Sequence, residues 1–279
     1  MRDIALTLLV FGSLPFIFYR PYFGVLVWSW LSYMNPHKLC YGFALTMPYA
    51  QIVAIVLLLS LLFTRQKLTM PFNATIAVWL TYLVWMFFTT AFSIFPDGAT
   101  DQLIKVVKIQ LVTFLTLLLI TDFKKLNQLI WVIVASIGFY SAKGGLFTVM
   151  TGGAYRVWGP GGSFIQENNS LAIATLMIVP LMIYLYKLHA ETLWLRSVIL
   201  VAAFMSVFSV LGSQSRGALI AIAAVGGFFW LKSQTKVLSG ILIAILAVLT
   251  FSFMPASWHE SMDTIQHYDQ DATAMGRIN

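Results

Sequence analysis

Residues 73–94 read NATIAVWLTYLVWMFFTTAFSI, a stretch that contains no charged side chain. A helix of about 20 apolar residues crosses the ~30 Å of hydrocarbon in a bilayer, so this stretch is long enough to span a membrane. Similar runs recur along the 279-residue chain, of which 59% is hydrophobic and only 10% is charged. Water-soluble domains carry roughly a quarter charged residues. The composition therefore predicts an all-α, polytopic transmembrane helix bundle.

We expect about ten spans in this chain. They lie at about 4–19, 22–35, 48–64, 73–94, 104–121, 128–150, 170–187, 196–212, 217–232 and 237–254. Their apolar residues are continuous rather than alternating, which disfavours a transmembrane β-barrel. The first two runs are short and are joined by Arg20 and Pro21, which fits either a tight hairpin or one broken element. On this interpretation residues 1–254 form the membrane domain. Residues 255–279 begin a large outer loop of a longer protein with further spans.

The loops alternate in charge, and this alternation predicts their sides. Lys and Arg collect in cytoplasmic loops of membrane proteins, so the net charge of +7 indicates topology rather than a nucleic-acid partner. The basic loops are 64–67, 122–125, 187–196 and 232–236. This leaves 95–103, 151–169, 213–216 and 255–279 on the opposite face, which in a bacterial inner membrane is the periplasmic face. The single cysteine, Cys40, excludes an internal disulfide and a thiolate metal site.

Arg216 lies on the outer face, where the charge rule cannot account for it. The sequence LGSQSRGALIAI at 211–222 places it in a short turn, after Ser215 and at the start of the next span. Snorkelling from a helix end is one explanation. However, a cation at that point adds to the positive end of the helix dipole, which is unfavourable unless an anion lies between them. We therefore interpret Arg216, with Ser215, as part of an anion site.

The loop at 151–169 carries groups that suit the same kind of ligand. Its candidate substrate-binding residues are Arg156, Gln166, Asn168 and Asn169. Its glycines let backbone amides approach a ligand closely, and its Asn and Gln side chains pair with hydroxyl groups. Trp158 either stacks on a sugar or lies in the interfacial aromatic belt. Asn169 or Ser170 is also a candidate cap for the following helix.

Residues 255–279 are the most polar stretch of the chain. Their histidines, His259 and His267, and their carboxylates fit no compact metal motif, so we predict no metal and no cofactor. An amphipathic segment on the membrane surface is the better interpretation. Arg277 joins Arg156 and Arg216 on the outer face. Three guanidiniums with few compensating acids in the core loops of that face indicate a phosphate-like anion, because the planar guanidinium donates two parallel hydrogen bonds to it.

Four stretches give the sequence a family resemblance. They are SQSRGAL at 213–219, GRIN at 276–279, RPYFGVLVWSWLSYMNPHKL at 20–39 and GPGGSFIQENNSLA at 159–172. The first two resemble segments of the O-antigen ligase and polymerase superfamily. The last two are similar to the O-glycosylation ligases associated with the exosortase A system. The resemblance covers most of the chain.

This resemblance implies a metal-independent membrane glycosyltransferase. Such an enzyme moves a glycan from undecaprenyl diphosphate to an acceptor hydroxyl, on a lipid or a protein, at the periplasmic face of the inner membrane. In that family two periplasmic arginines bind the diphosphate, and they correspond to the catalytic candidates Arg216 and Arg277. The family also uses a histidine late in the large periplasmic loop as general base. The sequence stops before that region, so neither His259 nor His267 is assigned this role.

Two other functions remain as alternatives. A polymerase of the same superfamily extends the lipid-linked glycan itself and differs only in its acceptor. A transporter or flippase of lipid-linked sugars should carry ionisable residues deep within several spans. The predicted spans carry almost none, and the charges gather at one face. This pattern favours an enzyme that opens to the periplasm.

Overall fold

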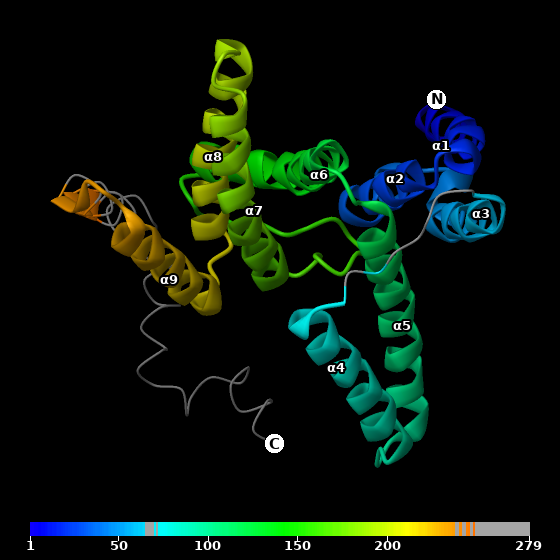
Figure 1. The fold of residues 1–279 in the computed structure, drawn as a ribbon. Coiled ribbons are helices and arrows are strands. Elements are labelled where there is room, and N and C mark those ends of the chain that lie inside the picture. The colour runs from blue at the N-terminus through cyan, green and yellow to red at the C-terminus, as the bar shows by residue number, and fades with distance from the viewer. Residues whose placement is uncertain (65–69, 71, 238–239, 242–243, 246–247, 249–279) are drawn as a thin grey trace. The chain divides into compact units, whose positions relative to one another are not determined.

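The computed structural model describes residues 1–64, 70, 72–237, 240–241, 244–245 and 248. Within these ranges it contains α-helices, short 3-10 turns and no strand, which confirms the all-α prediction (Figure 1). The α-helices are α1 (Arg2–Tyr19), α2 (Pro21–Met34), α3 (Tyr49–Phe63), α4 (Ala74–Ala91), α5 (Pro96–Leu119), α6 (Phe123–Met150), α7 (Asn168–Leu188), α8 (Leu193–Gly212) and α9 (Arg216–Lys232). Two 3-10 turns, Pro36–Leu39 and Phe43–Leu45, lie between α2 and α3.

Six helices in the described part are long and apolar enough to cross a membrane. They are α1, α4, α5, α6, α7 and α8. The others are shorter: α2 has 14 residues, α3 has 15 and α9 has 17. At 1.5 Å per residue such helices reach roughly 21–26 Å, which is less than the ~30 Å of a bilayer core. The prediction of about ten spans is therefore not confirmed, and the tenth candidate, 237–254, lies largely outside the described residues.

Two helices begin earlier than hydropathy predicts. The segment 95–103 was expected to be a loop, but α5 begins at Pro96 and includes most of it. Proline is favourable at the first helical position, and Asp97 in the first turn complements the helix dipole. Likewise α6 begins at Phe123 and so contains part of the basic segment 122–125. Apolar runs mark the part of a helix that can enter a membrane, whereas these helices continue beyond it.

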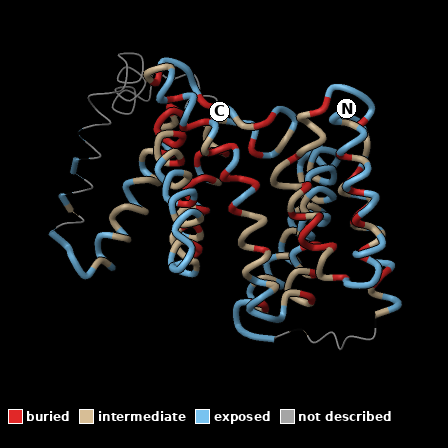
Figure 2. Tube along the Cα trace, turned by 90° about the horizontal axis from the view of Figure 1, so that it is seen from above, coloured by how far each residue is buried: buried red, intermediate tan, exposed pale blue. Residues whose placement is uncertain are grey.

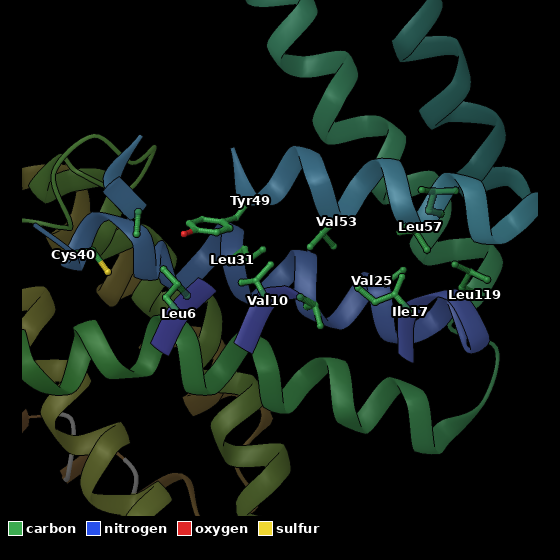
Figure 3. Close-up of a cluster of buried hydrophobic side chains, with 13 residues drawn as sticks. Leu6, Val10, Ile17, Val25, Leu31, Cys40, Tyr49, Val53, Leu57 and Leu119 are labelled. Carbon is green, nitrogen blue, oxygen red and sulfur yellow. The ribbon is translucent and has the colours of Figure 1, made fainter. Parts of the chain in front are cut away.

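The described chain packs as two compact units. Unit 1 comprises Met1–Ser32 and Cys40–Ile130, and unit 2 comprises Tyr33–Leu39 and the chain from Trp131 onward. In unit 1, the buried apolar cluster joins α1, α2, α3 and the end of α5 (Figure 3).

The first two helices form a tight hairpin. Arg20 is extended, with φ −136° and ψ 88°, and breaks the helix between α1 and α2. Figure 3 shows Val25 beside Ile17 and Leu31 near Val10, so α2 runs back along α1. Of the two arrangements that the sequence allowed, the structure has the hairpin.

The α4 and α5 helices of unit 1 expose most of their apolar surface. The Trp79 indole N–H of α4 donates to Gln110 Oε1 of α5 at 2.9 Å. Ile76 is the buried residue of α4, while large side chains such as Trp85 and Phe88 are exposed. Figure 2 shows exposed residues along much of the described chain. Such surfaces are unfavourable in water and favourable in lipid.

Unit 2 is built on close packing of α6, α7 and α8. A Cβ atom on Gly145 of α6 would collide with the Met205 carbonyl oxygen of α8, and one on Gly144 would lie 2.5 Å from Ser209 Oγ. Small residues of this kind let membrane helices approach one another closely. Between α6 and α7, the buried hydroxyls of Ser141 and Thr175 are hydrogen-bonded at 2.8 Å.

The two ends of unit 2 hold different loops. At one end, Trp131 of α6 donates its indole N–H to His189 Nε2 at 3.2 Å, just after α7. At the same end Arg196 of α8 donates to the Tyr186 hydroxyl at 2.7 Å. The loop 151–167 and the turn 213–215 meet at the other end, where Gln214 Nε2 donates to the Gly153 carbonyl oxygen. These two segments, which the charge alternation assigned to one face, thus lie together and away from the segment 187–196.

A candidate anion site at the start of two helices

The candidate site is built on the turn between α8 and α9. α8 ends at Gly212 and α9 begins at Arg216, so Arg216 opens the helix as the sequence predicts. Between them Ser213 is only 1% exposed, and Gln214 has a left-handed backbone with φ +51°. The turn is therefore compact and buried.

Ser215 caps α9. Its hydroxyl oxygen accepts a hydrogen bond from the Ala218 backbone N–H at 3.4 Å, and the Leu219 N–H reaches its carbonyl at 3.1 Å. A serine at this position satisfies one of the free N–H groups in the first turn of a helix. Arg216 follows directly and is half-buried.

The first two residues of α7 bind this same turn. Asn168 Nδ2 donates to the Ser213 carbonyl oxygen at 2.8 Å, and Asn169 Oδ1 accepts the Ser215 hydroxyl at 2.8 Å. A Cβ atom on Gly217 would lie 3.2 Å from Asn169 Oδ1, so the glycine leaves room for this contact. The N-terminal ends of α7 and α9, which α8 also contacts, therefore meet (Figure 1). Both helix dipoles direct their positive ends to this place.

The long loop of unit 2 reaches the turn through Arg156 and Gln214. Arg156 Nε donates to Gln214 Oε1 at 3.3 Å, and Gln214 Nε2 donates to the Gly153 carbonyl oxygen at 2.9 Å. The next residue, Val157, donates its N–H to the Gly212 carbonyl oxygen at 2.9 Å. These three bonds fix residues 153–157 against the end of α8.

Gln166 stabilises the glycine turn within the same loop. Its side-chain Oε1 accepts the Gly162 N–H at 2.7 Å, and its carbonyl oxygen accepts the Gly159 N–H at 2.9 Å. Gly162 has φ +71°, a conformation that favours glycine. Lys38, from the 3-10 turn after α2, lies over it: Lys38 Nζ is 3.3 Å from where a Cβ atom on Gly162 would be.

The described charges at this end of unit 2 are mostly positive. Arg156 and Lys143 are exposed, and Arg216 is half-buried. The acidic side chain in the same region is Glu167, the exposed residue that precedes α7. Cations beside two helix N-termini are an arrangement that favours an anion.

The structure thus brings together five of the residues singled out in the sequence. They are Arg156, Asn168, Asn169, Ser215 and Arg216. The sequence suggested Asn169 or Ser170 as the N-cap of α7, and neither residue is the cap. The N-cap residue is Glu167, whose side chain makes no capping hydrogen bond. Gln166 belongs to the neighbouring glycine turn. Arg277, His259 and His267 lie outside the described residues.

The role of Gln214 was not predicted from the sequence, although an uncharged polar residue between two apolar helices is itself a signal. Its left-handed backbone and its bond to Arg156 depend on the tertiary fold. In the described part of the chain, no group of three or more His, Cys, Asp or Glu side chains is placed to hold a metal ion.

Comparison with known proteins places part of this site in a family. Residues 1–190 match the model of DUF5935, which is described as a family of unknown function. The chain belongs to the DUF5935 family. The DUF5935 match includes Arg156 and both asparagines of α7, and it ends before Ser215 and Arg216. No curated protein and no solved structure matches the chain.

Proposed function

We propose that this chain is the membrane part of a glycan ligase of the O-antigen ligase type. It would transfer a glycan from undecaprenyl diphosphate to an acceptor hydroxyl on a lipid or protein. The observation that carries the proposal is the meeting of the α7 and α9 N-termini, joined by Asn169 and Ser215, with Arg216 in the first turn of α9. Backbone N–H groups, two positive dipole ends and a guanidinium are what a diphosphate requires.

The site would act by stabilising the leaving group. The acceptor oxygen attacks the anomeric carbon and forms the new glycosidic bond, while the bond from that carbon to the diphosphate oxygen breaks. Its electron pair leaves on undecaprenyl diphosphate, where Arg216 would balance the developing charge. The resemblance assigns Arg277 the same task and places the general base, which takes the hydroxyl proton, in the large periplasmic loop. No metal or cofactor takes part in this proposal.

The membrane arrangement is part of the proposal. The site would open to the periplasm from the inner membrane, because the basic segments 187–196 and 232–236 are then cytoplasmic. The short helices α2, α3 and α9 would cross a locally thinned bilayer, and 237–254 would add a tenth span.

The direct test is replacement of Arg216 in the full-length protein. We expect Arg216→Ala to abolish glycan transfer from the lipid-linked donor while the protein still inserts into the membrane. Arg216→Lys should restore little, since an ammonium group cannot donate two parallel hydrogen bonds from a rigid plane. The matched control is Lys187→Ala, which removes an exposed cation from the opposite end of α7. Full transfer by Arg216→Ala would refute the proposal.

The same assay separates the two alternatives by product. A ligase releases undecaprenyl diphosphate and leaves the glycan on the acceptor. A polymerase lengthens the glycan that remains lipid-linked. A flippase moves the donor across the bilayer without breaking the glycosidic bond, so no free undecaprenyl diphosphate forms.

A further inference from the structure

Gln214 occupies an unusual backbone position for its residue type. It is the residue after the α8 C-cap Ser213, its φ is +51°, and it is only 9% exposed. A left-handed conformation after a helix is normally taken by glycine, or by asparagine, because a longer side chain costs energy there. A residue held in such a conformation is a pointer to function when its side chain has a specific task.

The side chain of Gln214 has two partners, and both belong to the long loop. Its Nε2 donates to the buried Gly153 carbonyl oxygen at 2.9 Å, which fixes the orientation of the amide. Its Oε1 then accepts Arg156 Nε at 3.3 Å. The amide thus links a buried backbone group to the guanidinium of an exposed residue.

The way in which Arg156 is held leaves most of its donors available. A guanidinium has five N–H donors, and Gln214 takes the one on Nε. Arg156 as a whole is exposed, and among the described residues no further hydrogen bond from its guanidinium is found. Its two terminal nitrogens are suited to a bidentate contact with a phosphate group.

The chemistry of the amide preserves the charge of Arg156. A carboxylate in place of Gln214 would bind the guanidinium more strongly, but it would cancel the positive charge. A neutral amide orients the guanidinium and leaves its full charge for a ligand. Gln214, the partner of Arg156, lies two residues before Arg216. The turn between α8 and α9 therefore holds the Arg156 guanidinium and also leads directly into Arg216.

We infer that Gln214 is a positioning residue that holds the Arg156 guanidinium toward the anion bound at the α7 and α9 N-termini. The inference rests on the proposed function, because the anion is the diphosphate of the donor. Gln214 does not touch the substrate; it acts through Arg156. The sequence keeps glutamine at a position that glycine would fill at lower cost because the side chain performs this task.

The test uses Gln214→Gly in the full-length protein. Glycine is the residue that the left-handed backbone prefers, so relief of that strain should offset part of the stability lost with the two Gln214 hydrogen bonds, and the variant should still fold in detergent. Inorganic pyrophosphate is the probe, and calorimetry measures its dissociation constant. We expect Gln214→Gly and Arg156→Ala each to weaken binding about tenfold, as for one lost charge-assisted hydrogen bond.

A double variant distinguishes positioning from a general structural role. If Gln214 acts through Arg156, Gln214→Gly should add no further loss in a protein that already carries Arg156→Ala. Independent losses that multiply would overturn the inference. Unchanged binding by Gln214→Gly alone, with weaker binding by Arg156→Ala and Arg216→Ala, would also overturn it and leave the anion site intact.

Different results in the binding and transfer assays would refute the proposed function itself. If neither Arg156→Ala nor Arg216→Ala changes pyrophosphate binding, there is no such anion site, and the ligase proposal falls with the inference. If the coupling between Gln214 and Arg156 is found but the wild-type protein transfers no glycan, the ligase proposal is refuted and the positioning role stands.

Discussion

The Ser215 hydroxyl donates to Asn169 Oδ1 at 2.8 Å, and its oxygen accepts the Ala218 N–H at 3.4 Å. One side chain thereby caps α9 and joins it to α7. A cap is a local interaction, whereas the bond to Asn169 joins segments 46 residues apart. The start of α9, and with it the place of Arg216, is therefore fixed by α7.

The first prediction concerns this hydroxyl. Ser215→Ala removes the cap and leaves Asn169 Oδ1 without its donor, so we expect a loss of about 1–2 kcal/mol in the free energy of unfolding. Thermal unfolding in detergent measures it. The matched control is Ser197→Ala on α8, whose exposed hydroxyl bonds only to the Leu193 carbonyl oxygen of its own helix. Equal effects of the two substitutions would contradict the special role of Ser215.

A second variant separates stability from binding at the same position. Aspartate is also a good helix cap, so Ser215→Asp should retain more of the stability than Ser215→Ala. Its negative charge lies beside Arg216 and should repel a phosphate. We expect weaker pyrophosphate binding in Ser215→Asp than in Ser215→Ala, despite the better fold. Equal pyrophosphate binding by the two variants would mean that no anion binds at this turn.

The sequence predicted which segments of this site lie together better than it predicted the contacts that join them. Apolar runs fix which segments are helical, and the charge alternation grouped 151–169 with 213–216, because both signals follow from the membrane as a solvent. The sequence also marked Arg216, since a cation at a helix start needs an explanation. The pairing of Asn169 with Ser215 and of Gln214 with Arg156 was not predictable, because it depends on how α7 packs against α8 and α9.

The second prediction concerns the close approach of α6 and α8. A Cβ atom on Gly212 would collide with the Thr148 side chain, so Gly212→Ala forces the helices apart. Overpacking of this kind costs about 1–3 kcal/mol. The Gly212 carbonyl also accepts the Val157 N–H, so the displacement should weaken pyrophosphate binding as well.

A glycine in open space provides the control for this substitution. Gly226 lies inside α9, and no atom lies within 4 Å of a Cβ atom built on it. Alanine forms helices better than glycine by about 1 kcal/mol, so Gly226→Ala should be neutral or stabilising. Destabilisation by both variants would show that steric collision with Thr148 is not the cause.

The third prediction concerns the side of the membrane on which the site lies. Ser213 belongs to the turn but is 1% exposed, so a cysteine there is a poor target for labelling. Gly161 is exposed with open space around it, and Gly161→Cys should react with an impermeant thiol reagent added to the periplasm. Glu191→Cys, at the other end of unit 2, should react only after lysis. The reverse pattern would invert the proposed orientation.

The native cysteine should not interfere with this experiment. Cys40 is buried, and burial together with the negative charge of Asp3 raises the pKa of its thiol. The thiolate is the reactive form, so a raised pKa means slow labelling at neutral pH. The wild-type protein should therefore give little signal before denaturation and full signal after it.

The fourth prediction concerns Trp158, for which the sequence allowed a sugar contact or a place in the interfacial belt. Val157 is buried and bonded to Gly212, while Arg156 and Trp158 on either side are exposed. Alternate residues of an extended segment lie on one side, and the exposed–buried–exposed pattern of residues 156–158 fits such a segment, with the guanidinium and the indole both on its solvent side. If the guanidinium binds a phosphate, the ring is placed for the sugar attached to it.

This placement predicts different effects on two ligands. Trp158→Ala should raise the KM for the lipid-linked donor about three- to tenfold, because the apolar face of the ring is lost to the sugar. Its affinity for pyrophosphate, which has no sugar, should stay unchanged. The control is Trp194→Ala, which removes an exposed indole from the opposite end of unit 2. If both substitutions change the KM equally, Trp158 serves the membrane interface alone; if pyrophosphate binding also falls, the indole supports the fold of the loop rather than the sugar.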